Sequence, residues 1–431
     1  MRKPNQAAPL DAARAAWAAG GGQSDGHTWR TLPCKLVTPL YGGGVRPGQV
    51  DETLPVRVAG IRGQLRYWWR IACGPIPTSA ALTQGESEAM FQREVAIWGG
   101  IASTGPTTSK VAVRVDKVVG MNVAPAFVYT PNHKKAGEFR TMPEVAGWAE
   151  GYALFPAQGK LTPDKRHQEI PPHRLALANL GFSLRLRLHP DLTETERHEI
   201  ETALRWWASF GGVGARTRRG LGAVKVEGLA PVTETEVADR GGRLLLRAAD
   251  TTSDHAWKMS VGRLKDFRQK LDLGRNLPAP GSQSPAGRSR WPEADEIRRQ
   301  TGRHAPKHTP KDGVDGVYPR AAFGLPIVFH FKDENIGDPS QQLLVPAGLD
   351  RMASPLILRP YWNGRQWHPA ALLLPGWEQA LRVRVDFGTG PSQPAWPADP
   401  SERRTLADQI KPMQGRGTDP LTAFMDYFEK G

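Results

Sequence analysis

Cysteine is almost absent from this sequence: Cys34 and Cys73 are the only two in 431 residues. Two cysteines cannot supply a paired-cysteine metal site or a disulfide framework, so a reducing, cytoplasmic compartment is expected. Apolar runs are also short, and none approaches the ~18 residues that a membrane helix needs. The apolar part of the N-terminal segment is interrupted by Asp11 and Arg14, which is untypical of a signal peptide. We expect residues 1–28 to form a short helix or a disordered leader.

The motifs of the common enzyme classes are missing as well. There is no HExxH, no Walker loop, no GxSxG and no zinc-binding cysteine pair, so we expect no catalytic residue, no metal and no cofactor. The spacing of His304 and His308 would suit a metal only in a helix, and it lies in a Pro- and Lys-rich loop. The acidic pair Asp51 and Glu52 is more typical of a solvated turn than of metal-assisted cleavage. Any of the scattered histidines could act as a general base in RNA cleavage, but nothing selects one: His27, His133, His167 and His173.

Acidic residues are outnumbered, 43 against 57 basic residues, which gives a net charge of +14. Such an excess attracts polyanions and gains free energy from counterion release. Residues 258–311 alone hold 13 Lys and Arg against five Asp and Glu. We interpret this segment as a basic insertion that is mobile until bound, and RNA contact and a solvated loop remain alternatives for it.

The most informative stretch that is present reads GGVGARTRRG, residues 211–220. Glycine reaches positive φ at low cost and lets another backbone approach closely. Arginine offers a planar fork of donors that matches phosphate oxygens. Three arginines directly after a helix favour phosphate contact over a flexible, solvated turn. The predicted contacts are Arg216, Arg218 and Arg219.

A second basic feature is the segment IRGQLRYWWRIACG, residues 61–74, whose spacing predicts an amphipathic helix. Its polar face carries Arg62, Arg66 and Arg70 at intervals of four, where like charges repel one another. Two readings stay open: a face that binds phosphate, or a solvated face with acidic partners elsewhere in the fold. Trp68 and Trp69 are more typical of core packing than of base stacking.

The order of predicted elements indicates an α+β fold. Strict alternation in residues 182–190 predicts a half-buried strand, and Thr193 with Glu196 forms a capping box that begins the next helix. The strand–helix–strand–strand–helix–strand order is ferredoxin-like (RRM-like), with a hairpin or thumb-like insertion over about 120–175. The elements are expected at 31–44, 61–74, 110–117, 182–190, 193–210 and 222–229.

A second unit is expected after a linker at 231–242. Four apolar segments, GLPIVFHF, SPLILRP, HPAALLLP and ALRVRVDF, predict strands, and LTAFMDYFEK predicts a closing amphipathic helix. The expected organisation is two ferredoxin-like domains in tandem, at 29–230 with the glycine-rich loop and at 243–431 with the basic insertion. The apolar stripe of the last helix is more typical of core packing than of a docking face: Leu421, Phe424, Met425 and Phe428.

Three stretches, TPLYGGG (38–44), IRGQLRYWWR (61–70) and FGGVGARTRRGLG (210–222), together resemble the RAMP superfamily of CRISPR proteins. More narrowly, they are similar to the first subunit of the type III-B (Cmr) effector complex. YALFP, PRAAFGLPI and RMASPLILRP fit that subunit too. The first-strand loop and the basic helix would contribute Gly42, Gly43, Gly44, Arg62, Gln64, Arg66 and Arg70. The glycine-rich loop would contribute Gly211, Gly212, Gly214, Arg216, Arg218, Arg219 and Gly220.

The resemblance implies a non-catalytic RNA-binding subunit of an antiviral CRISPR ribonucleoprotein. It would hold the 3′ part of the CRISPR RNA at the head of the complex and help capture complementary target RNA, beside other RAMP subunits. Leu221 stands where the superfamily often has an aromatic residue, which puts stacking there in doubt. The alternatives are an endoribonuclease that processes or cleaves RNA, since RAMP relatives include ribonucleases, and a structural cap that touches little RNA.

Overall fold

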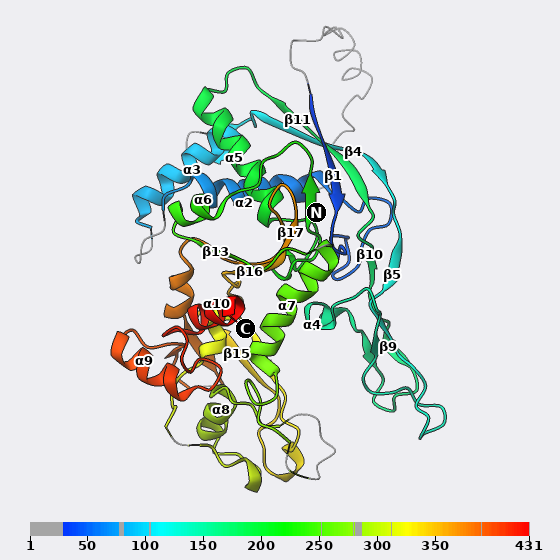
Figure 1. Ribbon diagram of the computed structural model, residues 1–431, viewed down its shortest axis with the longest axis vertical. Helices are drawn as coiled ribbons and strands as arrows, with labels where there is room; N and C mark the ends of the chain where they lie inside the picture. Colours follow the sequence, from blue (N-terminus) through cyan, green and yellow to red (C-terminus); the bar gives the residue numbers. More distant parts are fainter. Residues whose placement is uncertain are drawn as a thin grey trace, which may run out of the picture.

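The computed structural model describes residues 29–76, 82–102, 105–250, 252–278, 280, 287–311, 313–388 and 390–430. It shows an α+β protein with several small antiparallel sheets (Figure 1). The expected leader, residues 1–28, lies outside the described residues. No helix among those described is long and apolar enough to cross a membrane.

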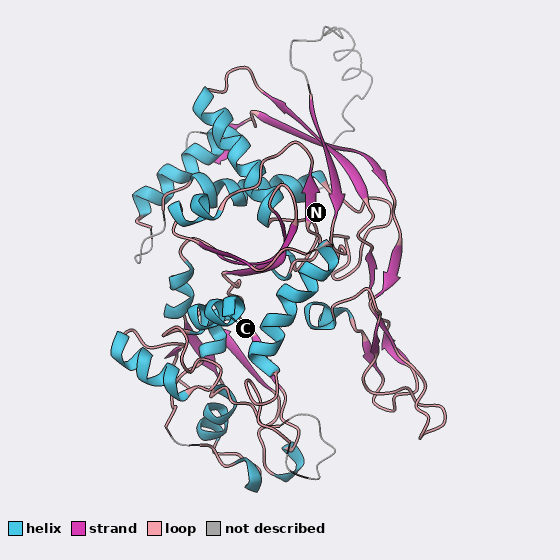
Figure 2. Cartoon of the chain, viewed as in Figure 1, coloured by secondary structure: helices cyan, strands magenta, loops and turns pink. Residues whose placement is uncertain are grey.

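The N-terminal half contains a four-stranded antiparallel sheet in the order β12-β1-β11-β4. With α2 following β1 and α5 following β11, the connectivity is the ferredoxin-like order predicted from the sequence. The capping box of Thr193 and Glu196 begins α5 as predicted. Two further helices, α3 and α6, flank α2 and α5 (Figure 2). The bounds are β1 Arg30–Leu36, α2 Val58–Cys73, α3 Gln84–Trp98, β4 Val111–Val119, β11 Gly181–Leu188, α5 Glu194–Phe210, β12 Val224–Val226 and α6 Glu234–Asp239.

Aromatic residues of α2 and α5 fill the core beneath this sheet. Trp68 and Trp69 are at most 2% exposed, which confirms their predicted packing role. The ring centroids of Trp68 and Phe210 lie 6.1 Å apart, and those of Trp206 and Phe210 lie 5.5 Å apart. Large buried rings contribute most of the apolar area of such a core, so the two helices are fixed firmly on the sheet.

The insertion between β4 and β11 is a series of short strands, as predicted. A hairpin at its end, near β9, extends away from the body of the protein (Figure 1). The elements are β5 Val123–Pro125, β6 Phe127–Val128, β7 Glu144–Val145, α4 Gly151–Leu154, η1 Phe155–Ala157, β8 Lys160–Leu161, β9 Gln168–Ile170 and β10 Arg174–Ala176. A smaller hairpin, β2 Gly100–Ala102 with β3 Gly105–Thr107, precedes β4.

The C-terminal half divides its strands between two sheets. One has the order β13-β17-β16, packs against α7 and lies close to α10, and the other has the order β14-β15-β18-β19. The second ferredoxin-like domain expected at 243–431 stays a prediction, because two of the four predicted strands pair with β15, which the sequence pattern did not reveal. The bounds are β13 Arg243–Leu246, α7 Ser253–Gln269, β14 Ile327–Phe329, β15 Gln342–Pro346, β16 Leu356–Trp362, β17 Trp367–Leu373, β18 Arg384–Phe387, β19 Gln393–Pro394 and α10 Pro420–Lys430.

The segment expected to be a linker, and the basic insertion expected to be mobile until bound, both contain packed helices. The predicted linker contains α6, which begins with its own capping box of Thr233 and Glu236 and buries Val237 completely. The expected basic insertion contains most of α7, with Leu264 and Phe267 fully buried, and α8 (Glu293–Thr301). Many of its cations pair with local carboxylates, which explains why a charge run can be structural: Arg288–Asp295, Arg290–Asp272, Arg298–Asp338 and Arg299–Glu296.

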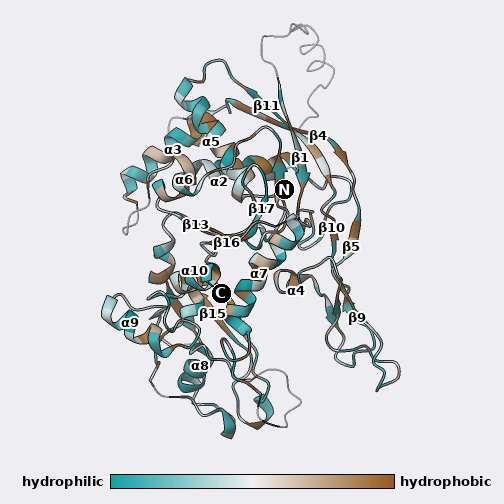
Figure 3. Cartoon of the chain, in the orientation of Figure 1, coloured by the Kyte–Doolittle hydropathy of each residue, from teal (hydrophilic) through white to brown (hydrophobic). Residues whose placement is uncertain are grey.

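The surface and the interior of the C-terminal half separate clearly by hydropathy. Helices α8 and α9 (Pro400–Gln409) are mostly hydrophilic (Figure 3). The apolar stripe of α10 is fully buried at Leu421, Phe424, Met425 and Phe428. This confirms the packing role predicted for that stripe.

The two halves share buried contacts. The rings of Phe210 in α5 and Tyr361 in β16 stack with centroids 5.9 Å apart. The Arg359 guanidinium, on the same strand, donates hydrogen bonds to the carbonyl oxygens of Gly211 (2.5 Å) and Ala208 (3.3 Å). The C-terminal half therefore supports the point at which α5 gives way to the glycine-rich loop.

Candidate nucleic-acid interface

The glycine-rich loop (residues 211–220) packs directly against the first-strand loop TPLYGGG (38–44). The Ala215 amide donates to the Tyr41 carbonyl at 2.7 Å, and the Thr38 hydroxyl donates to the Gly220 carbonyl at 2.6 Å. A Cβ placed on Gly43 would lie 3.4 Å from Gly214 Cα. Gly42 also lies on this contact, and Gly44 approaches Gln49. Backbone contacts this close require glycine.

The loop has a defined backbone structure and is not a flexible, solvated turn, which was the alternative interpretation of its sequence. Gly211 and Gly212 are buried, and Gly214 and Gly220 have positive φ angles of 79° and 77°. Residues Thr217–Arg219 form a short 3-10 helix, η2. Leu221 is fully buried, so no base can stack there. The position of the three arginines is consequently set before any ligand arrives.

Each of the three loop arginines contacts polar backbone or aromatic groups. Arg216 Nε donates to the Ala153 carbonyl at 2.7 Å, and its guanidinium carbon lies 5.4 Å from the Phe155 ring centroid. Arg218 donates to the Tyr67 hydroxyl at 3.2 Å. Arg219 donates to the Leu356 carbonyl at 3.1 Å. Within the described part of the chain, no carboxylate forms an ion pair with any of the three.

Burial lowers the pKa values of two of the loop arginines, Arg216 and Arg219. Burial, together with the nearby cations Arg268, Arg216 and Arg218, lowers the pKa of Arg219 to about 10. A half-buried cluster of like charges without a carboxylate favours an anionic ligand, because the ligand would replace the missing counter-charge.

Arg216 and Arg219 line a cleft of about 1630 Å³. Residues of α4, η1, α7 and the segment 320–333 form other parts of its wall. Six cations on its walls form no ion pair with a carboxylate among the residues that the structure describes. Four further cations are neutralised there by Asp295, Asp333, Asp338 or Glu293. The six cations without a carboxylate are Arg216, Arg219, Lys265, Arg268, Arg275 and Lys332.

Aromatic side chains lie among these cations. Phe155 is 59% exposed beneath Arg216, and Tyr152 accepts a hydrogen bond from Arg268 at 3.2 Å. The Arg268 guanidinium carbon lies 5.8 Å from the Phe323 ring centroid. Phe323 is buried, so Phe155 is the exposed ring of this group. Cations beside an exposed ring suit a single-stranded nucleic acid, since phosphates meet the cations and a base can meet the ring.

The arginines of α2 do not line this cleft. Arg66 Nε and Arg70 Nη2 bind the carboxylate of Glu94, at 2.5 and 2.7 Å, and Glu94 is 1% exposed. Arg62 donates to the Trp98 carbonyl. Of the two alternatives for this helix face, the structure therefore shows acidic partners elsewhere in the fold for Arg66 and Arg70. Gln64, which is half-buried, also lies outside the cleft lining.

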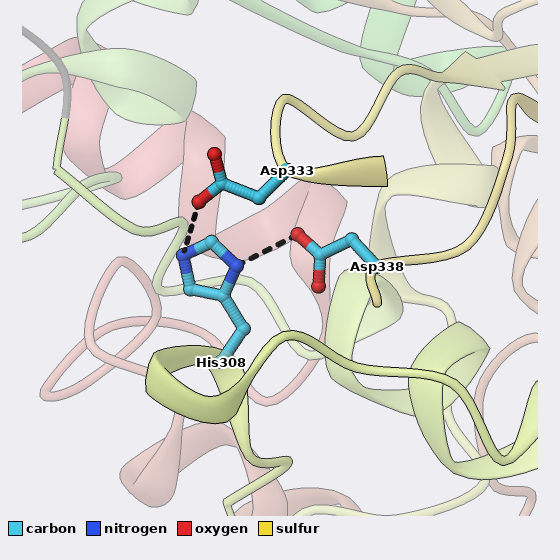
Figure 4. Close-up of side chains that lie close together, drawn as sticks. All are labelled: His308, Asp333 and Asp338. Atoms are coloured by element: carbon cyan, nitrogen blue, oxygen red, sulfur yellow. Dashed lines mark hydrogen bonds and ion pairs between the residues drawn. The ribbon is translucent and has the colours of Figure 1, made fainter. Parts of the chain in front are cut away.

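His308 meets two carboxylates at the edge of the cleft. Its Nδ1 lies 2.7 Å from an Asp338 oxygen, and its Nε2 lies 3.8 Å from an Asp333 oxygen (Figure 4). The three side chains lie close enough to hold a metal ion. Burial alone would raise the pKa of Asp338, but hydrogen bonds from Arg298, the Ala305 amide and His308 lower it to about 2. Arg298 pairs with Asp338 and Lys307 pairs with Asp333, so both carboxylates already have cationic partners. The cluster is therefore an ion-pair network in this structure.

The remaining candidates from the sequence are dispersed. The His304–His308 spacing does not form a pair of ligands: the partners of His308 come from positions 333 and 338. Asp51 pairs with Arg57 at 2.9 Å and Glu52 with Arg174 at 3.1 Å, which fits the solvated turn. His173 contacts the Tyr41 hydroxyl at 3.1 Å. His133 and His167 lie in the insertion, away from the cleft lining, and His27 is outside the described residues.

Sequence reasoning missed most of the cleft. Lys265 and Arg268 belong to the basic run at 258–311, so composition gave a signal for them, but α7 was not connected with the glycine-rich loop. Lys332 and Phe155 gave no signal beyond their residue types. These residues come together only through the packing of α7 between the two halves.

Comparison with known families identifies the class of protein. Residues 33–225, which extend from β1 to β12, match the RAMP superfamily. This match confirms the resemblance to the RAMP superfamily that the motifs predicted. No curated protein shows significant sequence similarity to it.

Several solved structures are similar to this chain. The crystal structure of apo Cmr1 from Pyrococcus furiosus is 12% identical, with 89% of this chain and 97% of that chain covered and a TM-score of 0.39. A chain of the type III-B Cmr-beta complex bound to cognate target RNA is 8% identical, with 90% and 99% covered and a TM-score of 0.40. Cmr6 from Pyrococcus furiosus is 12% identical, with 47% and 98% covered and a TM-score of 0.24. Likenesses this distant do not bear on what the present chain binds.

Proposed function

We propose that this chain is a non-catalytic RNA-binding subunit of a type III-B CRISPR ribonucleoprotein. It holds the 3′ part of the CRISPR RNA and helps capture complementary target RNA for antiviral defence, with other RAMP subunits as its neighbours. The motif resemblance and the superfamily match support the membership. The cleft beside the glycine-rich loop supports the binding of RNA.

The fold of the second half is proposed to be ferredoxin-like but incomplete. The elements β13, α7, β16, β17 and α10 follow the strand–helix–strand–strand–helix order, and the sheet order β13-β17-β16 matches the first three strands of that pattern. The last strand is not part of this sheet among the described residues.

The observation that carries the proposal is the convergence of Arg216, Arg219 and Arg268 in one cleft, where no carboxylate of the described residues forms an ion pair with them. Arginine binds phosphate oxygens with two parallel donors. Contacts of this kind position a strand without reading its sequence, and base pairing with the guide would supply the specificity. Phe155 offers an exposed ring on which a base can stack.

A double variant, Lys265→Ala with Arg268→Ala, tests the cleft. Binding of a labelled oligouridine should weaken about thirtyfold, at roughly 1 kcal/mol for each lost phosphate contact. The slope of log affinity against log salt should fall by about 1.4, since each contact on a single strand contributes about 0.7. Fluorescence anisotropy of the full chain at several salt concentrations measures both quantities.

The matched control removes the same charge elsewhere. Arg404 and Lys411 are exposed on α9 and just beyond it, and neither lines the cleft. Their double alanine variant should leave the affinity and the slope almost unchanged. If both double variants weakened binding equally, net charge would be the cause and the cleft would lose its assigned role.

An endoribonuclease is the second candidate, and the His308 arrangement favours it. A histidine oriented by a buried aspartate can take a proton from a ribose 2′-hydroxyl, and His308 lines the basic cleft with Asp338 at 2.7 Å. Our proposal predicts that labelled RNA stays intact after incubation with the full chain, with or without Mg²⁺ or Mn²⁺. Cleavage by the parent chain that is lost in a His308→Ala variant would contradict the non-catalytic role and identify the protein as an endoribonuclease.

A further inference from the structure

The face of the N-terminal sheet that points away from α2 and α5 is open. Along β1, Leu32, Cys34 and Leu36 enter the core, while the alternate residues Thr31, Pro33 and Lys35 are exposed. Because β1 lies inside the sheet, between β12 and β11, exposure on it shows that nothing in the described chain covers this face. We call this surface the outer face and define it by Trp29, Thr31, Pro33, Lys35, Arg114, Asp116, Ser183, Arg185, Arg187, Lys225 and Glu227.

The outer face is basic, with five cations against Asp116 and Glu227. Strand register places two pairs of cations directly opposite each other, Lys35 with Lys225 and Arg185 with Arg114. Like charges in such positions destabilise a sheet. Asp116 relieves the arginine pair, at 3.0 Å from Arg114 and 3.3 Å from Arg185. No carboxylate of the described chain forms an ion pair with Lys35 or Lys225, so the fold retains a repulsion that a polyanion would relieve.

Aromatic rings lie at both ends of these cations. The guanidinium carbons of Arg185 and Arg187 each lie 5.3 Å from the ring centroid of Trp29. Lys225 Nζ lies 4.0 Å from the ring centroid of Trp362, which belongs to β16 of the C-terminal half. Rings beside cations on an open four-stranded sheet match the way in which single-stranded RNA is bound on such sheets, by stacking and phosphate contact.

We propose that the outer face is a second binding surface for single-stranded RNA, separate from the cleft. None of its residues lines the cleft, and Lys35, Lys225 and Arg187 are the phosphate contacts. Trp29 is the stacking platform. An acidic protein surface would also satisfy the cations, but the rings favour RNA as the occupant. The inference goes beyond the proposed function, since a strand on this face is an additional occupant of the protein.

The triple variant Lys35→Ala, Arg187→Ala, Lys225→Ala tests the charge of the outer face. In the Lys265→Ala, Arg268→Ala background, binding of a short labelled oligouridine should weaken about a hundredfold, at the same loss per phosphate contact as in the cleft. The salt slope should fall by about 2 at roughly 0.7 per contact. The control is Arg404→Ala, Lys411→Ala, Lys430→Ala, which removes three exposed cations elsewhere. An unchanged thermal midpoint shows that the variants are folded. Equal effects of the two triple variants, or no effect of either, would overturn the proposal.

The stacking role needs its own readout. With 4-thiouridine in the oligonucleotide, photocrosslinking followed by mass spectrometry should place adducts on the peptide that contains Trp29 and Lys35. Trp29→Ala should remove these adducts, and Trp29→Phe should retain them. Adducts confined to cleft peptides would overturn the proposal. Normal RNA binding by the triple variant with failed assembly into the ribonucleoprotein would also overturn it, by assigning the face to an acidic protein neighbour.

The two surfaces can fail separately. In the parent chain the two surfaces should bind two short strands independently, so each variant should remove one binding event and leave the other unchanged. If the cleft variant loses binding and the outer-face variant does not, the proposed function stands and this inference falls. If only the outer-face variant loses binding, the cleft assignment falls and this inference stands.

Discussion

Replacing Gly220 by alanine should lower the free energy of unfolding by about 3 kcal/mol and displace the glycine-rich loop. Gly220 has a φ angle of 77°, and a Cβ there would lie 2.6 Å from Trp257 Cδ1 and 2.7 Å from the Leu358 carbonyl oxygen. The left-handed conformation costs a residue with a Cβ about 1–2 kcal/mol, and overpacking adds about 1–3 kcal/mol. Both obstructing groups belong to the C-terminal half, so the loop cannot move without separating the halves.

Gly228→Ala is the matched control for this prediction. Gly228 has the same φ angle of 77°, and no heavy atom lies within 4 Å of the Cβ position. Its replacement should cost about 1 kcal/mol from the backbone conformation alone. Urea unfolding of the two variants therefore isolates the close contact of the loop with α7 and β16. Equal losses would show that the C-terminal half does not hold the loop in place.

The first half of the fold follows from local signals. Alternation predicts β11, the stripe Ile61, Leu65, Trp68 and Ala72 predicts α2, and a capping box begins α5. Each signal lies within one element, and the order of elements then selects the sheet order. The second half gives fewer such signals. Its strands β14 and β18 are paired through β15, and strand pairing across dozens of residues leaves no periodic trace in the sequence.

The capping box of α6 shows a different kind of omission. Thr233 and Glu236 have the same spacing as Thr193 and Glu196, which correctly began α5. The segment was interpreted as a linker because it is short, polar and followed by two glycines. The signal was present, but the helix holds only six residues and buries a single valine. The linker prediction therefore followed the composition of the segment, although its capping box correctly indicates a helix.

The candidate site divides in the same way. The motifs singled out the two glycine loops but not the contact between them. The role of the α2 arginines depended on a residue that pattern analysis cannot place. Glu94 lies on α3, and the face that it presents to Arg66 and Arg70 is decided by how two helices pack. The walls of the cleft depend likewise on α7, whose Lys265 and Arg268 meet Arg216 only in the folded chain.

The largest effect of a single side chain is expected at Arg359, where alanine should lower the free energy of unfolding by about 3 kcal/mol. This residue is 3% exposed, and burial lowers its pKa to about 9. Its donors satisfy the carbonyl oxygens of Gly211 and Ala208 at the end of α5, where helix carbonyls otherwise lack partners. Each unsatisfied buried carbonyl costs about 1–3 kcal/mol, and the emptied volume adds a cavity cost.

Two further variants separate these contributions. Arg359→Met keeps much of the volume and removes the desolvated charge, so it should lose less stability than alanine. Arg365→Ala, in the exposed turn between β16 and β17, is the control and should change stability by less than about 0.5 kcal/mol. Because Gly211 begins the glycine-rich loop, Arg359→Ala should also weaken oligouridine binding severalfold at temperatures where it stays folded. If the alanine variant were as stable as the parent, the free-energy cost of burying the guanidinium would equal the contribution of its hydrogen bonds. The loop would then be held in place by its glycine contacts alone.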